Sequence, residues 1–197
     1  MIVTIASLKG GVGKTTTAVH LAAFFAEHGA TLLVDGDQNR SSLSWSRRGP
    51  EFPFLACDMA GAAKASKGRD HIIIDTAGGD RANLRDLSEG CDFLLLPSSP
   101  DALALEGLLG TVGTLKEIEN YGVALTMVDS RRRATAERAR AMLEELGIPV
   151  LKKSIRRLAA FEDAPLMGAL VQDTGHRMGR IAWGEYQSLG KELLTYA

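Results

Sequence analysis

The chain has 197 residues, of which 45% are hydrophobic and 24% charged, and its formal net charge is -1. This length and balance are typical of one globular domain with a full core, and no apolar run approaches the ~20 residues that a membrane-spanning helix needs. Cys57 and Cys91 show neither metal-type spacing nor histidines nearby, which argues against a disulfide framework. Because the start, MIVTI, carries no basic leader, we expect a cytoplasmic protein with a single domain over residues 1–197.

The first informative stretch is an apolar run, residues 2–6, followed by a glycine-rich loop. The run predicts a buried strand, and the apolar spacing from Ala18 to Phe25, ended by Gly29, predicts a helix after the loop. The loop matches the phosphate-binding pattern G-x-x-x-x-G-K-[ST]. Its expected ligand-binding residues are Gly10, Gly11, Val12, Gly13, Lys14, Thr15 and Thr16. The alternative is an ordinary glycine turn before a helix.

The residue types in this loop suit a phosphate ligand. Backbone N–H groups and the positive end of the helix would hold the phosphates. Lys14 would reach the outer phosphates, and the hydroxyl of Thr15 would be a ligand of Mg²⁺.

Two aspartates follow the second apolar run, residues 31–35. Polar loops at strand ends are where doubly wound sheets build their sites. Asp37 is well placed to orient a water or to approach the metal shell, since Mg²⁺ prefers few carboxylates and several waters. Asp35 and Asp37 could instead be plain loop and cap residues.

A third run, residues 71–75, ends in Asp75. Three isoleucines followed by aspartate fit the carboxylate that acts on Mg²⁺ through water in phosphate-loop enzymes. Thr76-Ala77-Gly78-Gly79 then offers mobile backbone that could sense the γ-phosphate. The expected metal-site residues are therefore Thr15, Asp37 and Asp75.

The remaining pattern alternates strands with helices. We expect strands at 52–56 (an edge strand), 92–96, 123–128 and 148–151, and helices at 41–48, 60–67, 81–89, 102–119, 134–146 and about 177–194. This alternation implies βαβ units and an α/β fold with a doubly wound, mainly parallel sheet.

The charge is distributed unevenly. Residues 131–157 contain nine Lys and Arg against three Glu, a net charge of +6, so the rest of the chain carries -7. Such asymmetry predicts a polyanionic partner on one face. A solvated helix face is the alternative, since no aromatic residues interleave the charges.

Lys9 is a second lysine in the loop and lies just before the glycines. The stretch Lys-Gly-Gly-Val-Gly-Lys-Thr resembles the deviant phosphate-binding loop of the ParA/MinD family of ATPases, which are SIMIBI-like. The Asp35–Ser41 stretch is similar to the family's D-x-D-P-N motif, with Gln38 where the family has proline. Asp75-Thr76-Ala77-Gly78 resembles the family's second switch. At Thr126 the family commonly has an asparagine that could recognise a base. The resemblance covers nearly the whole chain.

This resemblance implies an ATPase that uses ATP and Mg²⁺, with Lys9, Lys14 and Asp37 as its catalytic residues. Lys9 would reach across an ATP-sandwich homodimer, which would bind DNA non-specifically and be nucleoid-associated. A ParB-like or cargo-adaptor protein would stimulate hydrolysis, and the cargo would be a plasmid, a chromosome locus or a carboxysome-like body. The expected DNA contacts are Arg131, Arg132, Lys152, Lys153, Arg156 and Arg157. The chain resembles small ParA proteins without an N-terminal helix-turn-helix domain.

Two other classes remain open. MinD-like membrane cycling needs a basic amphipathic tail, whereas residues 191–197 contain one lysine and one glutamate, so we expect no membrane partner. The other class is a metabolic enzyme of related fold, either an ATP-dependent small-molecule ligase or an iron–sulfur reductase. Cys57 and Cys91 lie outside plausible switch loops, which disfavours the reductase.

Overall fold

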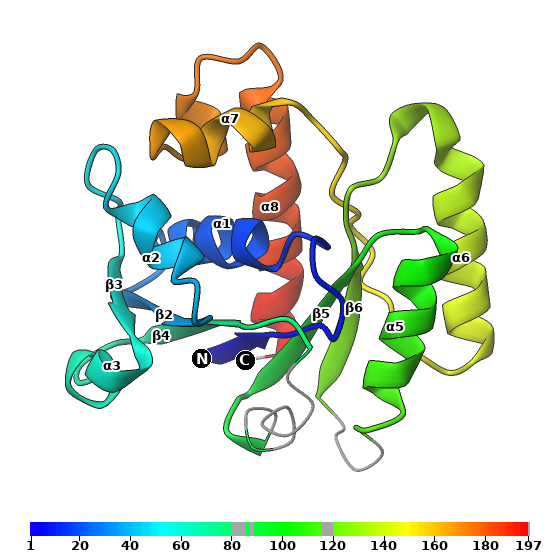
Figure 1. The fold of residues 1–197 in the computed structure, drawn as a ribbon, viewed down its shortest axis with the longest axis horizontal. Helices are drawn as coiled ribbons and strands as arrows, with labels where there is room; N and C mark the ends of the chain where they lie inside the picture. Colours follow the sequence, from blue (N-terminus) through cyan, green and yellow to red (C-terminus); the bar gives the residue numbers. More distant parts are fainter. Residues whose placement is uncertain (80–85, 87–88, 116–119, 197) are drawn as a thin grey trace.

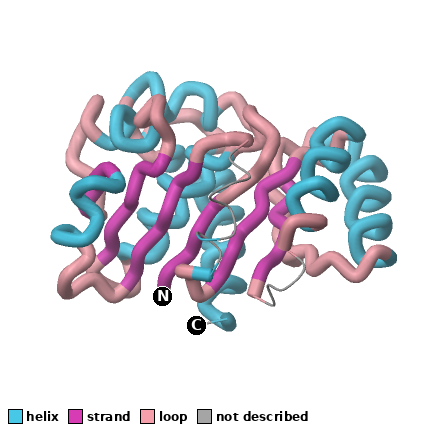
Figure 2. Tube along the Cα trace, turned by 60° about the horizontal axis from the view of Figure 1, so that its bottom comes forward, coloured by secondary structure: helices cyan, strands magenta, loops and turns pink. Residues whose placement is uncertain are grey.

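The computed structural model describes residues 1–79, 86, 89–115 and 120–196. The strands in these residues form one sheet in the order β3-β2-β4-β1-β5-β6, and every pairing is parallel. The strands are β1 (Ile2–Ile5), β2 (Thr31–Gly36), β3 (Leu55–Asp58), β4 (His71–Thr76), β5 (Phe93–Ser98) and β6 (Tyr121–Leu125), and Figure 2 shows them side by side. The expected α/β fold with a doubly wound sheet is confirmed.

Helices cover both faces of this sheet. They are α1 (Lys14–Ala26), α2 (Ser41–Ser46), α3 (Met59–Ala65), α5 (Ala102–Val112), α6 (Arg133–Glu145), α7 (Ala160–Met167) and α8 (Gly179–Leu193), with 3-10 turns at Ser130–Arg132, Val171–Asp173 and Leu194–Tyr196. In Figure 1, α1 and α8 lie on one side of the sheet, and α5 and α6 on the other.

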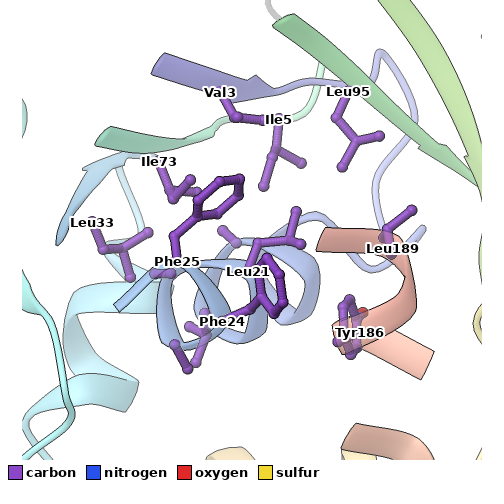
Figure 3. Packing of buried hydrophobic residues seen from close by; sticks show 14 of the residues in the cluster. Val3, Ile5, Leu21, Phe24, Phe25, Leu33, Ile73, Leu95, Tyr186 and Leu189 are labelled. Atoms are coloured by element: carbon purple, nitrogen blue, oxygen red, sulfur yellow. The ribbon is translucent and has the colours of Figure 1, made fainter. Parts of the chain in front are cut away.

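Neighbouring residues of β5 show why both faces need helices. Leu95 joins the core formed with α1 and α8, whereas Leu94 and Leu96 join the core formed with α5 and α6. Successive strand side chains point to opposite faces, so a continuous apolar run is buried on both sides. Figure 3 shows the first of these cores, where Phe25 of α1 points toward the strands and Tyr186 of α8 lies beside α1.

Strand register lines up the site at one edge of the sheet. The Cα of Asp75 pairs with Ile5 on one side and with Asp35 on the other. Because the strands are parallel, their carboxyl ends carry the phosphate loop and both aspartate loops to the same edge. The strand order reverses beside β1, which is the switch point where such sheets bind ligands.

Several expectations from the sequence change. Residues 148–151 form no strand; they meet β6 at one isolated bridge, Val123 to Val150, because Pro149 has no N–H to donate. Helix α5 ends at Val112 rather than at residue 119, with Gly113 at its cap. Helix α7, which contains Pro165 near its end, was not expected. The helix expected at 81–89 lies outside the described residues, apart from residues 86 and 89. The edge strand is present, shifted to Leu55–Asp58.

Candidate functional site

The phosphate loop lies between β1 and α1. Gly11 and Gly13 have φ angles of 75° and 85°, a left-handed conformation that glycine adopts without strain. Gly13 is the residue before α1, so the loop delivers its backbone N–H groups to the start of that helix. Thr126, the residue after β6, holds the loop in place, because its hydroxyl donates to the carbonyl of Val12 at 2.8 Å.

A cavity of about 490 Å³ lies beside this loop, within the size range of small-molecule sites. We call its two ends the phosphate end and the distal end. The phosphate end is lined by Gly10, Gly11, Gly13, Lys14, Thr15, Thr16, Asp37, Asn39 and Gly78; the distal end is lined by Thr126, Met127, Ile155, Arg156, Arg157, Leu158, Phe161, Glu162 and Tyr186.

Lys14 is held inside the phosphate end. Its Nζ lies 3.4 Å from the carbonyl oxygen of Lys9, and the residue is 8% exposed. Burial lowers the pKa of Lys14, while the charges of Asp75 and Asp37 act to raise it. A methyl group on Gly78 would lie 3.2 Å from Lys14 Nζ. The lysine is therefore surrounded on several sides and aimed at the cavity, where a phosphate would complete its charge pairing.

Asp35 and Asp75 occupy neighbouring positions but have different surroundings. Both oxygens of Asp35 are used: one accepts from the N–H of Asp37 at 3.0 Å and the other from Leu43 N–H at 2.8 Å. Asp75 is fully buried, and neither of its oxygens has a hydrogen-bond partner of good geometry. Burial raises the pKa of Asp75 to about 7, and the neighbouring hydroxyl of Thr15 opposes that rise.

An unpartnered buried carboxylate is costly unless a positive group joins it. The Asp75 carboxylate beside the Thr15 hydroxyl is an oxygen donor set that fits Mg²⁺, which takes few protein ligands and several waters or phosphate oxygens. Within the described residues, no group of three or more His, Cys, Asp or Glu forms a protein-only metal cage. The residues present thus suit a cation that is shared with a phosphate ligand.

The Asp37 loop is held by its own side chains. One carboxylate oxygen of Asp37 accepts from the backbone N–H of Asn39 at 2.9 Å and from its side-chain amide at 3.1 Å. Arg40 follows with a φ of 49°. This Asx turn stiffens the loop, which has Gln38 at the position where the family has proline. Asp37 also lines the cavity, and its charge acts to raise the pKa of Lys14.

Lys9 points away from the cavity that Lys14 serves. Its Nζ lies 3.4 Å from Asp101 Oδ1, at the start of α5, and its stem runs along Gly107, where a methyl group would lie 3.4 Å from Lys9 Cβ. Lys9 and Asp101 line a second cavity, of about 370 Å³, together with Arg132 and Arg157. The glycine at 107 therefore gives room to Lys9.

The distal end contains Tyr186, which was not expected to contact a ligand. Phe161 and Tyr186 line it, and the Tyr186 hydroxyl lies 3.1 Å from Thr17 Oγ1 of α1. Tyr186 was expected as one member of an apolar helix stripe, and its polar tip was the available signal. Thr126 donates its hydroxyl proton to the phosphate loop, so it has no donor left to offer a base, unlike an asparagine amide.

The basic residues expected to form one face are separated. Arg131 pairs with Asp129 at 3.3 Å and is exposed, whereas Arg132 and Arg157 border the Lys9 cavity. Lys152 and Lys153 line a third cavity with Lys191 of α8. Arg156 forms an ion pair with the buried Glu185 and lines the distal end of the first cavity. Arg156 thus already has a charged partner, and the expected DNA contacts stay predictions.

Comparison with known proteins places the chain among nucleotide-binding domains. Residues 3–171 match the family model for the CobQ/CobB/MinD/ParA nucleotide binding domain. The chain is 34% identical to maintenance of carboxysome distribution protein A from Gloeobacter kilaueensis, covering 98% of this chain and 93% of that protein. It is 25% identical to the chromosome-partitioning ATPase Soj from Thermus thermophilus, covering 86% of each. An McdA–ATP complex from Cyanothece has a similar fold, with a TM-score of 0.76 at 17% identity over 98% of this chain and 95% of that one.

Proposed function

Because this chain belongs to the CobQ/CobB/MinD/ParA family and is an ATPase, we propose that it positions a cargo by cycling on DNA. With ATP and Mg²⁺ bound, two copies pair across the nucleotides and hold DNA without reading its sequence. Hydrolysis separates the pair and releases the DNA. The cargo we favour is a carboxysome-like protein body, because the two relatives named for carboxysome distribution are 34% and 29% identical over nearly the whole chain.

The phosphate end supplies the groups that hydrolysis needs. The loop N–H groups and Lys14 bind the phosphates, and Thr15 and Asp75 would hold Mg²⁺, which would neutralise charge on the phosphate oxygens. Asp37, anchored by Asn39, orients the attacking water. The base then extends toward the distal end.

The observation that carries the dimer is the direction of Lys9. This lysine does not line the cavity of its own subunit; it lies beside Asp101 in the neighbouring cavity. The Lys9–Asp101 pair is solvent-accessible, with side chains 33% and 58% exposed, so little free energy is lost when the pair opens. Lys9 is thus available to phosphates held by a second copy.

Sedimentation with a non-hydrolysable ATP analogue tests this role. Lys9→Ala should stay monomeric and stop hydrolysis while it still binds ADP. Asp101→Asn removes the ion pair with Lys9 but keeps the lysine itself. Because Asn also caps a helix well, α5 should stay intact and this variant should still form dimers. A Lys9→Ala variant that pairs as well as the original protein would overturn the assignment.

DNA retention in the presence of ATP tests the second half of the proposal. Binding should require ATP and weaken steeply as salt is raised, because the contacts are with phosphates. The variants to compare are Arg131→Glu with Arg132→Glu, beside the Lys9 cavity, and Lys152→Glu with Lys153→Glu, on the α8 side. Loss in one pair identifies the DNA face, and full retention in both contradicts DNA contacts at these four residues.

The same preparation separates the other classes of function. ATP-dependent binding to anionic liposomes, with no retention on DNA, would support a membrane cycle instead. ATP turnover that depends on a small acid or amine would support a ligase. A ParB-like or adaptor partner is expected to raise the ATPase rate, and nucleoid localisation is expected while ATP is bound.

A further inference from the structure

The wall of the distal end is held in an unusual way. Residues 152–157, which contribute Ile155, Arg156 and Arg157 to the cavity, do not pair continuously with a strand. Their neighbourhood meets β6 and its extension at isolated bridges, Val123 to Val150 and Val128 to Arg156. Figure 1 shows this part of the chain rising between α6 and α8 toward α7. Its remaining backbone groups need partners from elsewhere.

Side chains of the two flanking helices supply those partners. From α6, Arg140 donates to the carbonyls of Leu151 at 2.9 Å and Lys152 at 3.2 Å. From α8, Glu192 accepts from the N–H of Lys152 at 2.9 and 3.0 Å through its two oxygens. Two helical turns earlier, Glu185 accepts from the N–H of Arg156 at 2.9 Å. The segment is therefore clamped on its carbonyl side by an arginine and on its N–H side by two carboxylates.

Glu185 differs from Glu192 in burial and in what it reaches. It is 3% exposed, and its second oxygen pairs with the guanidinium of Arg156. A buried carboxylate is tolerated when charged and N–H partners surround it, and Arg156 provides both. The next residue, Tyr186, lines the same cavity and contacts Thr17 of α1. Two consecutive residues of α8 thus connect the cavity wall to the helix that begins at the phosphate loop.

We propose that Glu185 is a positioning residue for nucleotide binding, which fixes Arg156 and the backbone around it as the wall against which the base end of the nucleotide packs. The proposal rests on the assignment of the nucleotide to this cavity. ATP and ADP have the same base and ribose, so a less rigid wall should lower the affinity for both nucleotides equally. The turnover rate at saturating ATP stays unchanged, because Lys14 and Asp37 lie at the phosphate end.

The test variant is Glu185→Gln, which keeps the size of the side chain and removes its charge. The dissociation constants for ATP and ADP, and the KM for ATP, should each rise about tenfold. Both oxygens of Glu185 accept from Arg156, whereas the glutamine amide has one accepting oxygen, so one of the two bonds is lost and the charge of Arg156 is left unpaired. The value of kcat should remain within about twofold of the original. Glu185→Asp, which keeps the charge, should recover part of the affinity.

Glu192→Gln is the matched control. It makes the same chemical change on the same helix, about 10 Å away along the axis, at a carboxylate that holds the same segment outside the nucleotide cavity. Its nucleotide affinity should stay within about twofold. If Glu185→Gln is folded by circular dichroism and binds both nucleotides as tightly as Glu192→Gln does, the proposal is wrong. A loss for ATP but not for ADP would also contradict it.

Amide hydrogen exchange of the unaltered protein tests the same wall without requiring any variant to fold. ADP should slow exchange at the amides of residues 155–158, and it should leave residues 150–153 unchanged. Equal exchange at 155–158 with and without ADP would overturn the proposal. Lys14→Ala checks the premise separately: if that variant binds ADP normally, the nucleotide assignment fails, independently of Glu185.

Discussion

The two ends of the nucleotide cavity are built by different means. The phosphate end consists of loops that directly follow β1, β2 and β4, and the sheet register alone places Asp75 beside Asp35. The distal end consists of Thr126 and Met127 after β6, an irregular segment, α7 and one face of α8, joined in part by side-chain contacts such as Arg156 with Glu185. Strand register thus fixes the phosphate end, whereas the distal end also depends on side-chain contacts between distant elements. Variants in the two regions should differ accordingly.

The largest effect is expected at the phosphate end, from Lys14→Ala. The lysine is buried against the cavity, so its loss would remove the cation that we propose binds the phosphates. Affinity for ATP, measured by calorimetry, should fall by about 100-fold or more. Lys64→Ala, on the exposed side of α3, is the control and should bind normally. Near-normal ATP binding by Lys14→Ala would mean that the phosphates lie elsewhere.

Asp37→Asn should separate binding from hydrolysis within the phosphate end. The amide can still accept from Asn39, so the loop should keep its shape, but it orients and polarises water poorly. We expect single-turnover hydrolysis to slow by about 100-fold with little change in the dissociation constant. Asp58→Asn is a matched control, because Asp58 lies at the end of the edge strand, where it caps α3 outside the cavity. Unimpaired hydrolysis in Asp37→Asn would remove Asp37 from the mechanism.

The packing behind the distal end should make stability depend on pH. His20 of α1 is fully buried: its Nε2 accepts from the N–H of Val171 at 3.1 Å, so its Nδ1 carries the proton and donates to Thr16 O at 2.7 Å. Its ring also stacks on Tyr186. This arrangement suits the neutral imidazole, and burial lowers the pKa of His20 from 6.5 to about 4.

The lowered pKa of His20 determines how stability changes with pH. The unfolded chain takes up a proton at His20 near pH 6.5 and the folded chain near pH 4, so the unfolded state is favoured as pH falls between these values. Urea unfolding should show a loss of about 2 kcal/mol from this group by pH 5. The slope should flatten in His20→Gln and persist in His28→Gln, which changes an exposed histidine. Equal slopes in all three proteins would contradict a buried neutral His20.

The same contrast explains which parts the sequence could predict. Gly11, Gly13, Lys14 and the two strand-end aspartate loops follow a local spacing, so strand, loop and helix could be placed from periodicity and turn chemistry. The distal end has no such spacing: Glu185 lies 29 residues from Arg156, and nothing in either neighbourhood indicates the pair.

For a related reason, the charge count of residues 131–157 does not indicate which basic side chains already have partners. The excess of positive charge predicted a polyanionic partner on one face, and within this segment Arg140 binds backbone carbonyls and Arg156 binds a buried carboxylate. The sequence shows how many basic residues a segment contains, but the side chain and carbonyls that bind these two arginines come from distant elements. Burial of a partner such as Glu185 is visible in the folded chain alone.

An effect of similar size is expected from the packing that holds α8 against α1. A methyl group on Gly190 would overlap the ring of Phe24 in α1, which is 1% exposed and cannot swing into solvent. Gly190→Ala should therefore lower the free energy of unfolding by about 1–3 kcal/mol. Gly184→Ala makes the same change in the same helix, with no atom within 4 Å of the new methyl group, and should raise stability by about 0.5–1 kcal/mol. Because α8 carries Glu185 and Tyr186, Gly190→Ala should also weaken ADP binding, whereas Gly184→Ala should not. If both variants shift stability in the same direction, contact between α8 and α1 through Gly190 does not set the position of the distal end.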